Sequence, residues 1–236
     1  MKRKKGRKLI SKRMLLTVMV SLAMVLGLMP GMSLKAYADD TKAYATYDVT
    51  TDANKNKSVD ELKALQVTFN GKPWYIISDN STAVDAGTVT LLVAEELGEP
   101  VMFDESSNAY SSSTVRTTLD NMTASGGSFA EVESAINTVK VKGSDNDVAV
   151  DAKLYLMSVD EVKCVPVNVL AFSHTWYLRT PARSEYNPDW IGVEFVRTDG
   201  IIGGGTDVYY SRCCIRPALQ LNLSSVTFSP ESNTFT

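Results

Sequence analysis

Residues 213–223, which read CCIRPALQLNL, constrain the fold of this chain most. Successive side chains of an extended strand point to opposite faces, so the alternation of this segment divides it into two sides. The apolar side would hold Cys213, Ile215, Leu219, Leu221 and Leu223. The polar side would hold Cys214, Arg216, Gln220 and Asn222. Because a strand that is apolar on one side packs against a core, the segment predicts a central strand of a folded domain.

A hairpin and a third strand are predicted nearer the start of the chain. Residues 65–69 (LQVTF) and 72–77 (KPWYII) are strand-like and flank Asn70 and Gly71. Asn-Gly is the strongest two-residue hairpin signal, because both positions tolerate positive φ. Residues 88–94 (TVTLLVA) are more uniformly apolar and predict a buried strand.

Two helices are expected after these strands. Residues 111–122 place Val115, Leu119 and Met122 at helical spacing behind a serine cap. Residues 128–139 repeat the pattern behind Ser128, with Phe129, Val132, Ile136 and Val139 as the apolar positions. Each helix is expected to lay its apolar face on the sheet.

The second half of the chain is predicted to be mostly β. Residues 154–158 (LYLMS) indicate a short strand, and Ser158 with Glu161 three residues later forms a capping-box pattern for a turn of helix. Further short strands are predicted within 176–223, where apolar runs are separated by Gly, Asp and Pro. Together these elements predict an α+β fold.

The N-terminus has the pattern of a secretory signal. A basic stretch, MKRKKGRKLISKR, precedes sixteen residues without charge, and Pro30 ends that run. Ala36 and Ala38 supply the small residues that a signal peptidase accepts, so we expect residues 1–38 to be a signal peptide cleaved after Ala38. An uncleaved membrane anchor is the alternative, but the run is short of the ~20 residues of a spanning helix.

The remaining chain is expected to be a secreted, extracellular protein with one domain. Residues 39–64 are polar and predict a flexible arm, residues 65–225 the domain, and residues 226–236 a tail or a truncated linker. Attachment to a cell surface through a region beyond residue 236 is the alternative to free secretion. No second apolar stretch is long enough to anchor the chain, so no membrane partner is expected after cleavage.

Removing the signal peptide changes the charge of the protein. Nine of the 24 Lys and Arg residues lie in residues 1–38, and none of the 27 Asp and Glu residues do. The mature chain therefore has 15 basic and 27 acidic groups, a formal net charge of −12. Such an acidic protein repels polyanions, so nucleic acid is not an expected partner.

The three cysteines exclude a scaffold built on disulfides. Cys213 and Cys214 are neighbours on a predicted strand and would point to opposite faces, so they cannot easily share one partner. Either Cys164 pairs with one of them or all three stay reduced. We favour free thiols, because a domain of this length folds without disulfides.

Two arginines lie close before prolines: Arg216 directly before Pro217, and Arg179 two residues before Pro181. Arg216 precedes Pro217, which favours an extended backbone, and Arg179 lies in WYLRTP (176–181). One interpretation is that both are solvated. The other is that Arg216 is partly buried and pairs with an acid such as Glu161 or Asp160, which would organise the fold.

These motifs resemble a known domain family. WYLRTP resembles a Trp-Trp-Leu-Arg-Ser-Pro motif, and residues 214–223 resemble a Gly-Val-Arg-Pro-Ala-Leu-x-Leu-Asn-Leu motif, of a domain of unknown function in secreted and surface proteins of Gram-positive bacteria. The resemblance covers about residues 65–225 and includes the hairpin, the helix at STVRTTLDN and the segment LYLMSVDEV. Tyr177, Thr180 and Cys214 depart from the family pattern.

The resemblance implies a fold similar to the C-type-lectin-like fold, which formylglycine-generating enzymes also use. That fold is a twisted antiparallel sheet flanked by two helices, with a long irregular insertion. Apart from the resemblance, the apolar alternation and the arginines close to prolines indicate that the two motifs are structural and hold the sheet together. The structural residues would be Trp176, Arg179, Arg216 and Glu161.

A Tyr-rich segment between the two motifs is the predicted ligand-binding surface. Rigid aromatic side chains give contact area at low entropic cost, and Asn, Asp and Arg in loops add adaptable polar contacts. The candidate residues are Tyr186, Asn187, Asp189, Trp190, Asp207, Tyr209, Tyr210 and Arg212. We expect a non-catalytic module that binds an extracellular glycan or protein; the alternative is that these aromatics only cover a small core, in a spacer domain of a larger surface protein.

Enzymatic or metal-dependent alternatives have weaker support in the sequence. A thiol oxidase of the formylglycine-generating kind would need Cys213 and Cys214, which the alternation opposes. His174 is the one histidine, and neither a nucleophile elbow nor zinc-ligand spacing is present. Asp145, Asn146 and Asp147 offer clustered oxygen ligands for calcium but lack the glycine and distal glutamate of an EF-hand loop. We therefore expect no catalytic residue, no metal and no cofactor.

Overall fold

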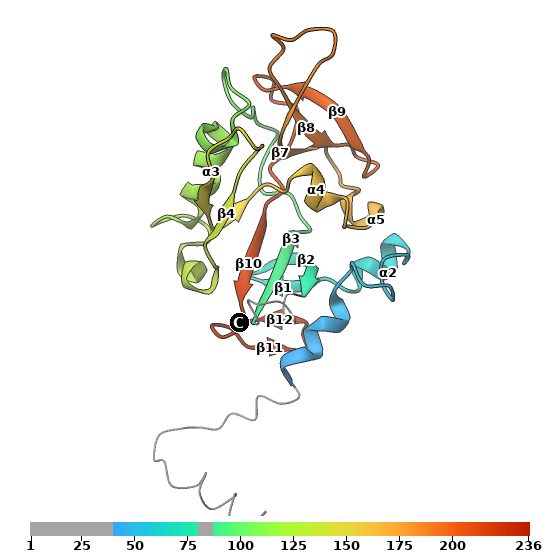
Figure 1. Ribbon diagram of the computed structural model, residues 1–236. Helices are drawn as coiled ribbons and strands as arrows, with labels where there is room; N and C mark the ends of the chain where they lie inside the picture. Colours follow the sequence, from blue (N-terminus) through green and yellow to red (C-terminus); the bar gives the residue numbers. More distant parts are fainter. Residues whose placement is uncertain (1–39, 80–86) are drawn as a thin grey trace, which may run out of the picture. The chain divides into compact units, whose positions relative to one another are not determined.

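The structure, a computed structural model, describes residues 40–79 and 87–236 (Figure 1). The largest sheet of these residues has seven strands. The strand order is β11-β12-β1-β2-β3-β10-β6. The bounds are β1 (Val67–Phe69), β2 (Lys72–Asp79), β3 (Thr88–Val93), β6 (Leu154–Tyr155), β10 (Ala218–Asn222), β11 (Phe228–Ser229) and β12 (Thr234–Phe235). The predicted signal peptide, residues 1–38, lies outside the described residues.

The middle of this sheet consists of strands that the sequence predicts. β1 and β2 form an antiparallel hairpin around Asn70 and Gly71, whose φ values are 50° and 68°. β10 pairs with β3 on one side and with β6 on the other, and Leu219 and Leu221 are fully buried. β10 begins after Pro217, because proline has no N–H to contribute to a sheet.

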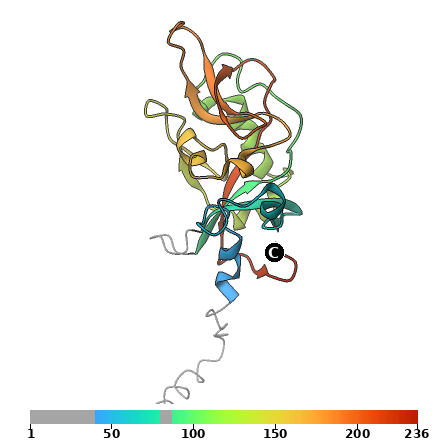
Figure 2. The same cartoon turned by 90° about the vertical axis from the view of Figure 1, so that its right-hand side faces the viewer.

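A separate three-stranded antiparallel sheet consists of β7 (Trp176–Ala182), β8 (Gly192–Val196) and β9 (Ile202–Asp207). Figures 1 and 2 both show this sheet at the opposite end of the unit from β11 and β12. β4 (Val139–Val141) and β5 (Val150–Ala152) form a short antiparallel pair of their own. The three-stranded sheet is the element that carries the predicted ligand-binding segment.

The first predicted helix is present, but the prediction of the second helix is wrong. α3 (Thr114–Thr123) begins behind Ser113, whose hydroxyl accepts from the amide of Arg116 at 3.1 Å. The second segment forms only a short 3₁₀ helix, η4 (Ala130–Ala135). Its later residues pair with strands instead: Ile136 bridges Leu221 in the main sheet, and Val139 enters β4. Tertiary pairing therefore overrides the helical spacing of this segment.

The remaining helical elements of the described residues are all short. They are η1 (Asp40–Tyr47), α2 (Val59–Lys63), η3 (Tyr110–Ser112), α4 (Val159–Val162) and α5 (Val167–Leu170). α4 begins with the predicted capping box of Ser158 and Glu161. Among the described residues, no helix has the length and apolarity that a membrane crossing requires.

Both ends of the described chain belong to the folded unit, which corrects the predictions of a flexible arm and a tail. Tyr44 in η1 is buried, and its ring contacts those of Phe228 and Phe235. The phenol of Tyr47 donates to the side-chain oxygen of Asn233 at 2.5 Å. β12 also pairs with β1. The sequence-based boundaries were wrong here because the few aromatics in these polar segments do not show the periodicity of a core element.

The architecture is thus a mixed α+β fold in which sheet dominates, as the sequence predicts. Its buried residues form one continuous hydrophobic core that includes residues of both sheets. The finer expectation of a C-type-lectin-like arrangement stays a prediction.

Candidate functional site

The two sequence motifs lie side by side where the three-stranded sheet begins. The amide of Cys214 donates to the carbonyl of Thr175 at 2.8 Å, and the amide of Tyr177 donates to the carbonyl of Cys214 at 3.2 Å. Trp176 and Cys214 form a parallel bridge. The chain therefore comes back at Cys214 to the place where Trp176 begins β7, and these contacts anchor both ends of the intervening residues 178–213.

Hydrogen bonds of Arg179 connect the start of residues 178–213 to helix α4. Its guanidinium donates to both carboxylate oxygens of Glu161, at 2.5 and 2.7 Å, and to the carbonyls of Leu156 and Lys142 at 2.6 and 2.9 Å. Glu161 also accepts from the amide of Ser158, which begins α4. This bidentate contact satisfies a buried arginine with a fixed geometry.

Arg216 does not pair with an acid, contrary to the hypothesis that Glu161 or Asp160 is its partner. Glu161 is the partner of Arg179, while Asp160 pairs with Lys163. The guanidinium of Arg216, whose residue is 1% exposed, donates to the carbonyls of Val93 (2.9 Å) and Leu170 (3.2 Å). No carboxylate among the residues that the structure describes forms an ion pair with it.

Aromatic rings and carbonyls take the place of that acid. The guanidinium carbon of Arg216 lies 4.4 Å from the ring centre of Phe172 and 5.1 Å from that of Trp176. The carbonyl of Leu170 accepts from Arg216 and from the indole of Trp176 (3.1 Å), so one acceptor joins the two motifs. Burial lowers the pKa of Arg216 to about 9, which leaves it charged at neutral pH.

The backbone of residues 208–212, which carries Tyr209 and Tyr210, is held by several hydrogen bonds. The carbonyl of Val208 accepts from the amides of Phe103 and Asp104, at 2.9 and 3.2 Å. The phenol of Tyr177 lies 2.8 Å from the carbonyl of Tyr210, and the hydroxyl of Thr175 donates to the carbonyl of Arg212 at 2.9 Å. Residues 208–212 are therefore fixed along their backbone.

The loop between β7 and β8, residues 183–191, is organised by its own side chains. The hydroxyl of Ser184 accepts from the amides of Tyr186 and Asn187, at 3.3 and 3.1 Å. The side-chain oxygen of Asn187 accepts from the amide of Asp189 at 3.2 Å. Asn187, a predicted ligand-binding residue, thus uses its oxygen to shape the loop, while Tyr186 is 97% exposed.

Trp190 lies on a surface made by glycines. A Cβ placed on Gly192 of β8 would overlap the far edge of the indole, and a Cβ on Gly205 of β9 would lie 2.6 Å from it. The indole N–H donates to the carboxylate of Asp207 at 2.5 Å. Because these glycines have no side chains, the indole ring can pack directly on the backbone of β8 and β9, and the hydrogen bond to Asp207 fixes its orientation.

Tyr209, Tyr210 and Arg212 form an exposed cluster beside the Trp190 indole. The ring centres of Tyr209 and Tyr210 are 4.5 Å apart, and the two residues are 49% and 41% exposed. The guanidinium carbon of Arg212 lies 4.4 Å from the ring centre of Tyr210. The negative charge of Asp207 raises the pKa of Tyr209, with contributions from the hydroxyl of Tyr210.

The predicted ligand-binding residues lie on two connections at the same end of the three-stranded sheet. This follows from the pairing of Gly192 with Asp207 and of Ala182 with Gly192. Direct contacts join Trp190 to Asp207, and Tyr210 to both Tyr209 and Arg212. Tyr186 and Asp189 are exposed in the loop 183–191. We call this set the aromatic end surface: Tyr186, Asn187, Asp189, Trp190, Asp207, Tyr209, Tyr210 and Arg212.

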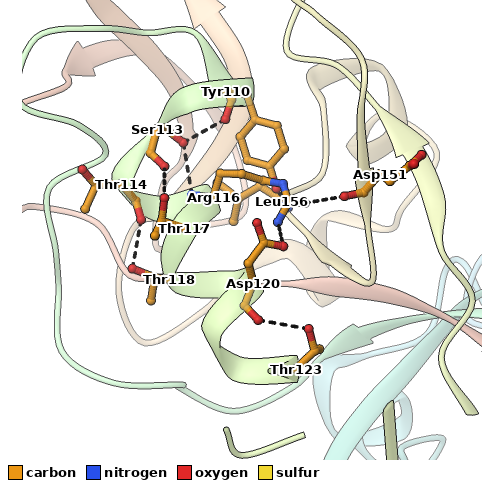
Figure 3. A network of polar contacts seen from close by, with 10 residues as sticks. All are labelled: Tyr110, Ser113, Thr114, Arg116, Thr117, Thr118, Asp120, Thr123, Asp151 and Leu156. Atoms are coloured by element: carbon orange, nitrogen blue, oxygen red, sulfur yellow. Dashed lines mark hydrogen bonds and ion pairs between the residues drawn. The ribbon is translucent and has the colours of Figure 1, made fainter. Parts of the chain in front are cut away.

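Sequence reasoning missed a polar network behind α3 (Figure 3). The buried side chain of Arg116 pairs with Asp120 and donates to the carbonyl of Asp151, but its Nε atom has no hydrogen-bond partner among the residues that the structure describes. The phenol of Tyr110 accepts from the amide of Leu156 at 3.2 Å, and burial raises its pKa to about 12. The network joins α3 to the β5–β6 region, so its contacts are structural.

Cys213 and Cys214 are poorly placed for thiolate chemistry. Cys164, Cys213 and Cys214 are all free, and the last two are buried. Burial raises the pKa of Cys213 to about 11 and also raises that of Cys214. Because the thiolate is the reactive form, these environments disfavour the oxidase alternative.

The residues considered for calcium and for catalysis have other contacts. Asp147 accepts from the hydroxyl of Ser111 at 2.5 Å and from the amide of Gly143 at 3.1 Å, and Asp145 pairs with Lys142. His174 contacts Glu96 at 2.6 Å on the surface. In residues 40–79 and 87–236, no group of three or more His, Cys, Asp or Glu residues is arranged to hold a metal ion.

The chain matches no protein-family model, no curated protein and no solved structure. The resemblance to the Gram-positive domain family therefore stays a prediction from its motifs.

Proposed function

We propose that this chain is a non-catalytic module that binds an extracellular ligand, a protein or a glycan, through the aromatic end surface. The proposal joins two expectations from the sequence, export by a signal peptide and a ligand surface between the two motifs. Membership in the secreted Gram-positive domain family, with its lectin-like fold, is part of the same proposal.

The observation that carries the proposal is the contrast between fixed backbone and exposed rings. Residues 208–212 are held by Phe103, Thr175 and Tyr177, yet Tyr209 and Tyr210 leave about half of their surface in solvent. Single exposed aromatic residues are ordinary on a protein surface, but Tyr209 and Tyr210 are exposed side by side, with ring centres 4.5 Å apart, and contiguous exposed apolar surface is typical of interaction sites. Exposed rings on a rigid backbone lose little entropy when a ligand binds, which favours a recognition surface.

The test is a screen of the mature chain, residues 39–236, on a glycan array and in cross-linking with extracellular proteins. For any ligand found, the double variant Tyr209→Ala/Tyr210→Ala should weaken binding at least tenfold, the size expected for removal of a hot spot of ~2 kcal/mol. Its melting temperature should stay close to that of the parent, because both side chains are exposed.

Ile201→Ala is the matched control. Ile201 is 53% exposed in the β8–β9 turn, at the opposite end of the same three-stranded sheet. Equal effects of the two variants on ligand binding would contradict the proposal. Screens without any ligand would instead favour the spacer alternative.

A further inference from the structure

In the aromatic end surface, the ring of Tyr210 already binds a cation of the protein itself, the side chain of Arg212. The guanidinium carbon of Arg212 lies 4.4 Å from the ring centre of Tyr210, within the range of a cation–π contact. Tyr209 lies next to it, with a ring-centre distance of 4.5 Å and about half of its surface exposed. Tyr209 therefore offers a second ring beside one that already carries a cation.

A carboxylate without a cationic partner accompanies this second ring. Asp207 accepts from the indole of Trp190 through one oxygen, and among the described residues it forms no ion pair. Its charge is close enough to Tyr209 to be the main cause of the raised pKa of that phenol. The exposed ring of Tyr209 therefore has the negative charge of Asp207 near it, and the positive charge of Arg212, on the neighbouring ring of Tyr210, opposes this only in part.

We propose that Tyr209 and Asp207 bind an arginine side chain presented by a protein partner. This inference rests on the proposed function and narrows its ligand. A guanidinium can stack flat on an aromatic ring and donate to a carboxylate through its edge, and its planar fork loses less conformational entropy per hydrogen bond than the ammonium of lysine does. The mature chain has a net charge of −12, so long-range attraction also favours a basic partner.

A protein partner fits the surface better than a free cation. One exposed cation–π contact changes affinity by only about two- to fivefold, so tight binding needs further area. Tyr186, which is 97% exposed, lies on the neighbouring loop at the same end of the sheet. A folded partner can cover both loops, whereas a small cation contacts one ring.

The test uses the peptide acetyl-Gly-Arg-Gly-amide and the mature chain, with NMR shifts of the Trp190 indole N–H as the readout. The same peptide with citrulline, which keeps the shape but not the charge, is the ligand control. We expect the arginine peptide to shift this signal in the millimolar range and the citrulline peptide to bind at least threefold more weakly. A methyl glycoside of N-acetylglucosamine forms the saccharide arm.

Asp207→Asn is the decisive variant, because asparagine keeps an oxygen acceptor for Trp190 and removes only the charge. It should weaken arginine-peptide binding at least threefold. Glu231→Gln removes the same charge from an exposed position between β11 and β12 and should leave binding unchanged. Equal binding of the citrulline peptide, or equal effects of the two variants, would overturn the inference.

The saccharide arm separates this inference from the proposed function. If the glycoside shifts the Trp190 signal and the arginine peptide does not, the binding module stands and the arginine site is refuted. If no probe binds and the wider screens also find no ligand, both are refuted.

Discussion

Arg179→Met should destabilise the domain strongly, because Arg179 is a buried cation whose contacts come from three separate segments. Its guanidinium donates to Glu161 through two bonds and to the carbonyls of Leu156 and Lys142. Methionine keeps much of the volume of the side chain but supplies no donor. The variant therefore leaves the Glu161 carboxylate and both carbonyls without this partner.

The expected magnitude follows from the burial of the pair. Removing one partner of a buried ion pair costs roughly 3–5 kcal/mol, because the other charge remains uncompensated. The side chain of Glu161 is 39% exposed and that of Arg179 is 8% exposed, so water offsets part of the loss. We expect about 3 kcal/mol, at the lower end of that range. For a domain of this size, such a loss lowers the melting temperature by roughly 6–12 °C.

Urea unfolding and thermal melting followed by circular dichroism measure this effect. Arg197→Met is the control, since Arg197 is 56% exposed and its ion pair with Asp199 should contribute less than ~1 kcal/mol. The double variant Arg179→Met/Glu161→Met should recover part of the stability, because it no longer leaves a carboxylate unpaired. A loss below ~0.5 kcal/mol for Arg179→Met, the level of an ordinary surface change, would refute the reasoning.

Two further predictions concern the aromatic end surface. Gly192→Ala should displace the Trp190 indole, shift its N–H signal in NMR spectra and destabilise the domain by ~1–3 kcal/mol, whereas Gly204→Ala should do neither because a Cβ there has nothing within 4 Å. Asp207→Asn should lower the pKa of Tyr209, since Asp207 raises it and a neutral residue no longer opposes the phenolate; phenolate absorbance should then rise at lower pH than in the parent, and an unchanged titration would contradict the electrostatic argument.

The sequence predicted the elements whose signals are local. Asn70-Gly71 fixes a turn through its own backbone preferences, and Ser158 with Glu161 closes a capping box within four residues. The alternation of residues 213–223 indicated the buried Leu219 and Leu221 of a central strand, but Cys214 and Arg216, on its predicted polar side, are buried as well. Each of these signals depends on a few neighbouring residues, so it can be read without knowing the rest of the fold.

The predictions that failed depend on contacts between distant segments. Arg179 and Arg216 both lie shortly before a proline, and only the tertiary structure decides that Glu161 reaches the first and not the second. Ile136 has helical spacing with its neighbours but bridges Leu221, more than eighty residues away. The aromatic contacts of Tyr44 with the C-terminal hairpin are of the same kind.

The predicted site residues differ in what they do, which the sequence could not reveal. Trp190 and Asp207 contact each other and the glycines of β8 and β9, so changing Trp190 should affect stability and ligand binding together. Tyr186 and Tyr209 project from anchored backbone and are largely exposed, so their loss should affect binding alone. A recognition surface needs both kinds, since exposed rings gain specificity only where supporting contacts hold their backbone in place.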